Sequence, residues 1–220
     1  MKYYLCRTFL CFSLFVYLGA DGQVTSLNAA KEKAVKLFDG KTLAGWSGDT
    51  GNIWHIEDGA IAGGSLEVPV PHNFFLTTTK PYGNFILKLQ FKLVCKEGFM
   101  NAGVQFRSTK MNDPSYEMVG YQADLGPGYW ASLYDESRRN KTLAGADSLL
   151  VTRLLKPDEW NDFEIRAADN HIAIFLNSVQ TVNYTETDTS IPQQGLIGLQ
   201  IHGGGKTKVW YRNIFITEMQ

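Results

Sequence analysis

The feature that most constrains the fold is the run 84–94, NFILKLQFKLV, in which apolar and polar side chains alternate. Successive side chains of a β-strand point to opposite faces of the sheet, so this alternation predicts a strand with one buried face. The opposite face is basic and polar, with Ile86 as its apolar exception. The side chains expected in the core are those of Phe85, Leu87, Leu89, Phe91 and Leu93.

Shorter alternating runs continue from Leu37 to the end of the chain, and glycine or Asn/Asp turns separate them. Asp58-Gly59 and Asp169-Asn170 are expected at the turns of two β-hairpins. Roughly ten or more short strands with glycine-rich connections predict an all-β sandwich of two antiparallel sheets. A concave face of one sheet is the expected place for a ligand.

Residues 1–20 have the pattern of a secretory signal peptide. Lys2 and Arg7 precede the apolar run 9–18, and Gly19-Ala20 supply the small residues of a cleavage site. The run is short for a membrane span, so we expect an exported protein without stable membrane insertion; an N-terminal anchor is the alternative. The chain of 220 residues is 44% hydrophobic, which fits one globular domain. We therefore expect a signal peptide at 1–20, a lead-in at 21–36 and one domain at 37–220.

Charge and cysteine content restrict the partners and the compartment. Removal of residues 1–20 leaves 19 basic and 22 acidic side chains, a net charge of −3, which argues against nucleic acid as a partner. Cys95 is the one cysteine outside that segment, so an internal disulfide is excluded and the core must supply the stability. These features favour a secreted or periplasmic bacterial protein.

The stretch 116–139, YEMVGYQADLGPGYWASLYDESRR, concentrates polar and aromatic side chains. Carboxylates and amides bind hydroxyl groups, and aromatic rings cover the apolar face of a pyranose, so this composition is typical of a sugar site. A β-hairpin with an ordinary polar loop is the alternative. The polar and acidic candidates are Glu117, Gln122, Asp124, Asp135 and Glu136.

Two other strands carry polar side chains on one face. In 101–108, Asn101, Gly103, Gln105 and Arg107 alternate with apolar residues. This pattern favours a groove lining, and a solvated outer face is the alternative. In 195–205, Gln200 and His202 lie opposite the apolar side chains.

Seven blocks in order resemble the 3-keto-disaccharide hydrolase family, long known as a domain of unknown function. The blocks are LFDGKTLAGW (37–46), TTTKPYGNFILKLQFKL (77–93), NAGVQFRS (101–108), GYQADLGPGYWASLYDESRR (120–139), KPDEWNDFEIRA (156–167), GLIGLQIHGG (195–204) and VWYRNIFI (209–216). The resemblance implies a concanavalin A-like jelly roll that cleaves glycosides already oxidised to a ketone at sugar carbon 3. Characterised relatives are mostly bacterial envelope or secreted proteins. Many relatives have Glu and Gln where this chain has Gln122 and Asp124, which leaves the identity of the base open.

Cleavage of a 3-keto-glycoside needs a base for the carbon-2 proton, a group that stabilises the enolate, and an acid for the leaving group. Both elimination and net hydrolysis fit this chemistry. The expected catalytic residues are His202, Asp124, Glu117 and Arg107. The expected substrate-binding residues are Gln105, Gln122, Trp130 and Tyr134. Glu117 has the wrong strand parity to join Gln122 and Asp124 and needs a β-bulge at Gly120.

Other readings remain open at the level of sequence. No compact metal-ligand motif is present, although a divalent metal held by His202 with Asp124 or Glu117 is a possible cofactor that would stabilise an enolate. The polar strand faces suit a non-catalytic carbohydrate-binding module equally well. An interaction domain of an envelope complex has only the fold in its favour. In the first two readings the partner is a glycoside or oligosaccharide.

Overall fold

The structure, a computed structural model, describes residues 33–219, which form fifteen strands and one short helix. In sheet A the strands run in the order β13 (Val179–Thr185), β12 (His171–Leu176), β11 (Asn161–Ala168), β6 (Phe85–Gly98), β15 (Gly205–Glu218), β4 (Ala60–Gly64) and β3 (Trp54–Glu57), and β1 (Val35–Lys36) pairs with β15. In sheet B the order is β10 (Lys141–Ala144), β9 (Leu133–Glu136), β8 (Met118–Leu125), β7 (Ala102–Lys110), β14 (Leu196–Ile201), β5 (Phe74–Thr78) and β2 (Trp46–Ser47).

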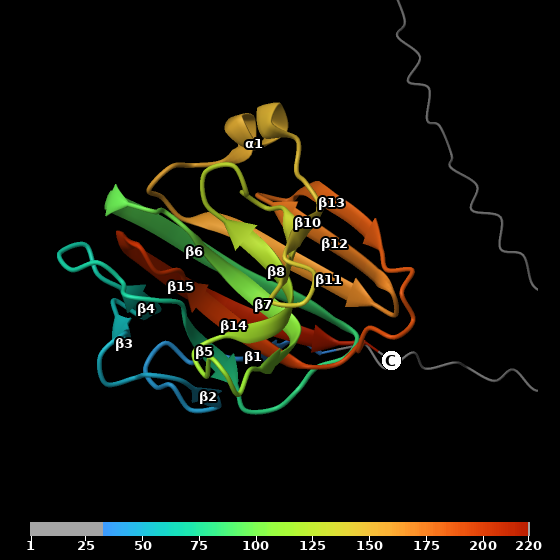
Figure 1. Ribbon diagram of the computed structural model, residues 1–220, viewed down its shortest axis with the longest axis horizontal. Helices are drawn as coiled ribbons and strands as arrows, with labels where there is room; N and C mark the ends of the chain where they lie inside the picture. The colour runs from blue at the N-terminus through green and yellow to red at the C-terminus, as the bar shows by residue number, and fades with distance from the viewer. Residues whose placement is uncertain (1–32, 220) are drawn as a thin grey trace, which may run out of the picture. The chain divides into compact units, whose positions relative to one another are not determined.

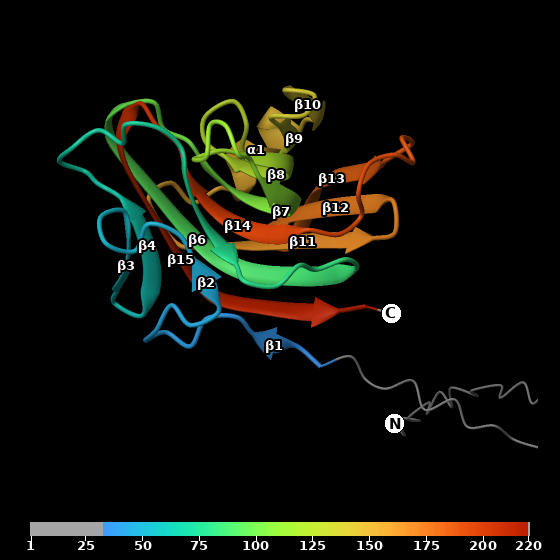
Figure 2. The ribbon, with the colours of Figure 1, turned by 60° about the horizontal axis from the view of Figure 1, so that its bottom comes forward.

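All pairings between these strands are antiparallel, and the two sheets pack face to face as a sandwich (Figures 1 and 2). This confirms the all-β, two-sheet prediction. The helix α1 (Ser148–Leu154) lies at one end of the sandwich, between β10 and β11 in the chain (Figure 1). Asp147 caps it by accepting a 2.7 Å hydrogen bond from the Leu150 N–H. Within residues 33–219, no helix is long and apolar enough to span a membrane.

The alternating run 84–94 lies in β6, at the centre of sheet A. Phe85, Leu87, Leu89 and Phe91 are at most 3% exposed and belong to the single large hydrophobic core between the sheets. Lys88 on the opposite face is exposed, as the alternation predicts. The register is fixed because a slip by one residue would turn all these apolar side chains to the outside.

The predicted boundaries are partly outside the described residues. The signal peptide at 1–20 and most of the lead-in at 21–36 lie there. The end of the lead-in already belongs to the fold, since Val35 and Lys36 pair with Ile216 and Phe215 of β15.

Candidate functional site

One face of sheet B is polar, and strand register sets its side chains in rows. Gly198 of β14 pairs with Gln105 of β7, Gln105 with Gln122 of β8, and Gln122 with Tyr134 of β9. Two residues further along, the next row runs from Gln200 through Gly103 to Asp124. Because strand side chains alternate, all these positions point to the same side, away from the core between the sheets.

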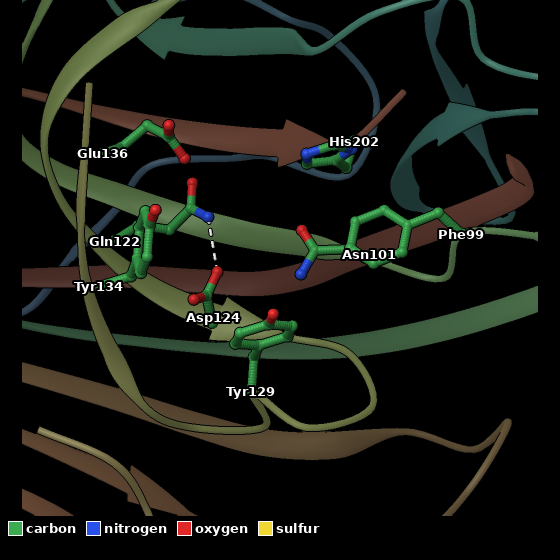
Figure 3. A pocket seen from close by; sticks show the side chains of 8 residues that line it. All are labelled: Phe99, Asn101, Gln122, Asp124, Tyr129, Tyr134, Glu136 and His202. Atoms are coloured by element: carbon green, nitrogen blue, oxygen red, sulfur yellow. Dashed lines mark hydrogen bonds between the residues drawn. The ribbon is translucent and has the colours of Figure 1, made fainter. Parts of the chain in front are cut away.

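A cavity of about 170 Å³, here called the central cavity, opens on this face. It is lined by Phe99, Asn101, Gln122, Asp124, Tyr129, Tyr134, Glu136 and His202 (Figure 3). These residues come from β8 and β9, from the loop between them, and from the segments next to β7 and β14. The cavity therefore combines side chains that are up to about a hundred positions apart in the sequence.

Asp124 is the most deeply buried acid of the central cavity, with 4% of its surface exposed. Its Oδ1 accepts a 2.6 Å hydrogen bond from Nε2 of Gln122 (Figure 3). Burial raises the pKa of Asp124 to about 7; the Gln122 bond lowers it and the nearby Glu136 charge raises it further. A carboxyl group with such a pKa can both give and take a proton near neutral pH.

His202 follows β14 and faces Asp124 across the cavity (Figure 3). Its Nδ1 lies 2.7 Å from the carbonyl oxygen of Gly203. A carbonyl only accepts, so Nδ1 carries the proton, and in the neutral ring Nε2 is left with a free lone pair. The Phe99 ring packs edge-on against the imidazole at a centroid distance of 4.8 Å, which restricts the ring orientation.

Glu136 and Tyr134 form the wall on the β9 side. Burial, more than any other cause, raises the pKa values of both side chains. Glu136 pairs across the strands with Gly120 of β8. The central cavity therefore holds two carboxyl groups with raised pKa values near one imidazole.

The polar face also contains buried atoms without a hydrogen-bond partner among the described residues. They are Oε1 of Gln122, Nε2 of Gln105, and both polar side-chain atoms of Gln200. Such atoms are rare in folded proteins, because each costs about 1–3 kcal/mol when it is left unpaired. Their concentration on one face is typical of a surface that water or a polar ligand completes.

The structure brings together four of the eight residues expected from the sequence: His202, Asp124, Gln122 and Tyr134 line the central cavity. Gln105 lies on the same face but is fully buried beside Gln122, where it accepts a 2.6 Å hydrogen bond from the Ser108 hydroxyl. It therefore supports the cavity from below rather than lining it.

Glu117 precedes β8 and lies next to the central cavity without lining it. Its Oε1 accepts a 2.8 Å hydrogen bond from Asn73 Nδ2. The bulge expected at Gly120 is instead in β7: Arg107 and Ser108 together oppose the single residue Gly120 of β8. The expectation that Glu117 lines the cavity is therefore corrected. Glu117 lies just outside β8, so strand parity does not set the direction of its side chain.

Arg107 does not face the central cavity, which corrects the expectation for this residue. It occupies the β7 bulge with φ of +47°, and this backbone conformation reverses the direction of the side chain. The guanidinium group donates to the Gly83 carbonyl (3.0 Å), the Asp169 carbonyl (2.5 Å) and Oδ1 of Asn84 (3.0 Å). Arg107 thus joins two turns and has no donor directed at a ligand in the cavity.

Trp130 was expected to bind the substrate, but it does not line the central cavity. Its ring stacks on Phe91 at 6.2 Å and packs against the core, and the preceding Tyr129 lines the cavity in its place. The loop 126–132 has no regular alternation from which this could be read. Phe99, Asn101 and Glu136 also line the cavity. Asn101 was expected on a groove-lining strand face and Glu136 among the acidic candidates, but neither was assigned a catalytic or substrate-binding role, and no sequence signal indicated Phe99.

Metal binding has no further support from the described residues. Among residues 33–219, no group of three His, Cys, Asp or Glu side chains is arranged to hold a metal ion. A divalent metal thus stays an untested alternative.

Comparison with solved structures shows the same fold in carbohydrate-related proteins. A protein from Parabacteroides distasonis described as a "putative glycosyl hydrolase" is 20% identical, with a TM-score of 0.62 over 85% of this chain and 94% of that one. The carbohydrate-binding module CBM66 from Bacillus subtilis is 13% identical, with a TM-score of 0.60 over 79% of this chain and 96% of that one. At these identities the likeness concerns the fold. No curated protein sequence matches the chain.

A match to a protein-family model shows the family of this chain. The model described as the 3-keto-alpha-glucoside-1,2-lyase-like domain matches residues 33–217, nearly all of the described chain. The blocks that carry the resemblance in the sequence lie within this match, and they include the strands that line the central cavity. The chain belongs to the 3-keto-α-glucoside-1,2-lyase-like domain family.

Proposed function

We propose that the protein cleaves 3-keto-α-glucosides by elimination across sugar carbons 1 and 2. The observation that carries this proposal is that a buried carboxyl group, Asp124, and the free Nε2 of His202 line the same polar cavity. Family membership supports the substrate class. The residues support the proton transfers that this chemistry needs.

In this mechanism, Nε2 of His202 removes the proton from carbon 2, which the neighbouring ketone makes acidic. The electrons of the broken C–H bond form an enolate at carbons 2 and 3, and the amide of Asn101 stabilises its oxygen. When the ketone reforms, a C1=C2 double bond is made and the C1–O bond breaks. Asp124 gives its proton to the departing oxygen. The products are an alcohol and an unsaturated 3-keto sugar; addition of water to the double bond completes net hydrolysis.

The test is incubation of the purified protein with methyl 3-keto-α-glucoside and with methyl α-glucoside, each with and without a chelator. We expect release of methanol from the keto sugar alone. Asp124→Asn and His202→Gln are expected to reduce turnover by about 10²–10⁴-fold, since each removes a proton-transfer group. Asp58→Asn, at the exposed turn between β3 and β4, and His171→Gln, at the exposed start of β12, are the matched controls. Because the acid must be protonated, the activity should fall as the pH rises through about 7.

Two outcomes would contradict the proposal. Equal cleavage of the unoxidised glucoside would indicate an ordinary glycosidase. Binding of the keto sugar without any turnover, with or without added metal, would favour a carbohydrate-binding module, whose fold the chain shares with CBM66.

We also propose that the protein is exported after removal of residues 1–20, because they have the charge and apolar pattern of a signal peptide. N-terminal sequencing of protein from cell fractions tests this. A mature form that begins near Asp21 is expected. An intact membrane-bound form would contradict it.

A further inference from the structure

The segment between β7 and β8, residues 111–117, forms one wall of a second cavity. Met118, where β8 begins, packs on β14: a Cβ atom on Gly198 would lie only 2.9 Å from the Met118 sulfur. Beyond β14, Glu117 meets Asn73, the residue before β5, through the 2.8 Å hydrogen bond described above. The segment thus crosses the polar face of sheet B from β8, past β14, to the beginning of β5.

The second cavity has a volume of about 200 Å³, similar to that of the central cavity. It lies between this segment and the strands β2 and β5. The side chains that line it and matter here are Asp49, Asn73, Phe74, Lys110, Tyr116 and Glu117. Its wall therefore offers two carboxyl groups, an amide and an ammonium group next to aromatic rings.

An aromatic stack builds the rim of the second cavity. The His72 ring lies between Phe74 and Tyr116, with centroid distances of 4.2 Å to each. Tyr116 is 44% exposed, so much of its ring surface is accessible although it is held against His72. A fixed, accessible ring beside hydrogen-bonding groups suits the apolar C–H face and the hydroxyl edge of a pyranose.

Asn73 and Glu117 belong to the lining of the second cavity, and Asn73 is bonded to the chain beside the central cavity. Oδ1 of Asn73 accepts a 3.1 Å hydrogen bond from the N–H of Gly203, the neighbour of His202, while its Nδ2 holds Glu117. Oε2 of Glu117 is buried and has no partner among residues 33–219. Burial raises the pKa of Glu117, the nearby Glu136 carboxyl group raises it further, and the hydrogen bond from Asn73 lowers it.

We propose that the second cavity binds the aglycone sugar of a 3-keto-disaccharide, with Tyr116 as its stacking platform and Glu117 at the boundary between the two rings. This inference rests on the proposed function, which places the oxidised ring in the central cavity. The bond that breaks joins the two sugars, so the second ring must lie next to the central cavity. The second cavity meets this requirement because Asn73 in its lining is bonded to Gly203, the residue after His202 of the central cavity.

The test compares two substrates with the same oxidised ring: methyl 3-keto-α-glucoside and a 3-keto-α-glucosyl-glucose disaccharide. In Tyr116→Ala, kcat/KM for the disaccharide should fall by about five- to tenfold, because the stacking surface is lost. For the methyl glycoside it should stay within about twofold of wild type. Tyr116→Phe keeps the ring and should retain most of the disaccharide activity. Leu149→Ala, an exposed position on α1, controls for surface truncation.

Equal losses on both substrates, or no loss on either, would overturn the proposal. If the wild-type protein cleaves neither substrate, the proposed function has failed, and binding then tests the cavity by itself. Calorimetric titration with maltose and with methyl α-glucoside should show weaker maltose binding in Tyr116→Ala and unchanged binding of the methyl glycoside. Absence of maltose binding, or the same affinity in both proteins, would also overturn it.

Discussion

At the scale of single residues, Asp124 shows how position rather than residue type creates a reactive group. An aspartate in water has a pKa near 3.8, whereas burial raises this one to about 7. The folded state therefore binds a proton that the unfolded chain releases between these two pH values. Stability contributed by this group is highest at acidic pH and falls as the pH rises from about 4 to 7.

This linkage predicts that Asp124→Asn stabilises the protein at pH 8 and has much less effect at pH 4. The amide is neutral at both pH values, so it avoids burial of the negative charge that the wild type carries at pH 8. We expect a rise in Tm of a few degrees at pH 8, at about 2–4 °C per kcal/mol for a chain of this size. Thermal unfolding followed by circular dichroism at both pH values measures it. A variant that is less stable than wild type at pH 8 would contradict the role of burial.

At the scale of elements, the antiparallel pair β7–β8 supplies the floor of the central cavity. Gly103 pairs with Asp124, and the Gln122 side chain lies over it: a Cβ atom at Gly103 would be 2.8 Å from Cδ of Gln122. The missing side chain thus leaves the space in which Gln122 reaches Asp124. Glycine is needed here for close approach rather than for an unusual backbone angle.

Gly103→Ala should therefore displace the Gln122 amide and break its bond to Asp124. We expect a fall in kcat/KM of at least about tenfold, or roughly 1.4 kcal/mol of lost transition-state stabilisation, while the fold is retained. Gly145→Ala, just after β10, is a control for glycine replacement as such, because a Cβ there would meet only Cγ2 of Thr142 at 4.0 Å. Steady-state kinetics and circular dichroism measure the two properties. Full activity in Gly103→Ala would show that the Gln122 position is unimportant.

The bulge of β7 leads to a different expectation for Arg107. Its three hydrogen bonds tie β7 to the turn before β6 and to the turn between β11 and β12. Arg107→Ala leaves two backbone carbonyls without these donors and should lower the free energy of unfolding by about 2–3 kcal/mol. Urea denaturation measures this, with the exposed Arg166→Ala as the control. A large loss of kcat without loss of stability would restore the catalytic reading.

At the scale of the whole domain, a buried charged network joins the two sheets. Glu186 follows β13 of sheet A and accepts a 2.7 Å hydrogen bond from the hydroxyl of Tyr121 in β8 of sheet B. Arg139 binds Glu186 at 2.7 Å and also Asp135, which is fully buried in β9. Since Tyr134 and Glu136 flank Asp135, the network also holds one wall of the central cavity in place.

Glu186→Gln should destabilise the protein more at pH 7 than at pH 3. Burial alone would raise the pKa of Glu186, but hydrogen bonds from Arg139 and Tyr121 outweigh it and lower the pKa to about 2. Its stabilising contribution is complete above about pH 4.5 and declines as the pH falls towards 2. At pH 7 we expect a loss of about 2 kcal/mol. Thermal unfolding measures it, with the exposed Glu218→Gln as the control. An equal shift in Tm at both pH values would exclude a role for the charge.

The sequence by itself determined the all-β class of this protein and the direction of most of its strand side chains. The alternation in 84–94 fixed the buried face of β6, and strand parity placed Gln105, Gln122, Asp124 and His202 on one polar face. These are local properties, since a strand repeats every two residues whatever it packs against. The blocks of sequence also indicated the family, and the family model over residues 33–217 confirms it.

Only the tertiary structure decided which polar residues meet. Arg107 has the right parity in the sequence, but a bulge turns it towards two turns elsewhere in the fold. Trp130 and Tyr129 are neighbours, and packing on Phe91 sends the first to the core and leaves the second at the cavity. Bulges and loop packing depend on partners that are distant in the chain, so no local period encodes them. The pKa of Asp124 is likewise a property of the assembled surroundings, because desolvation requires all the strands that enclose it.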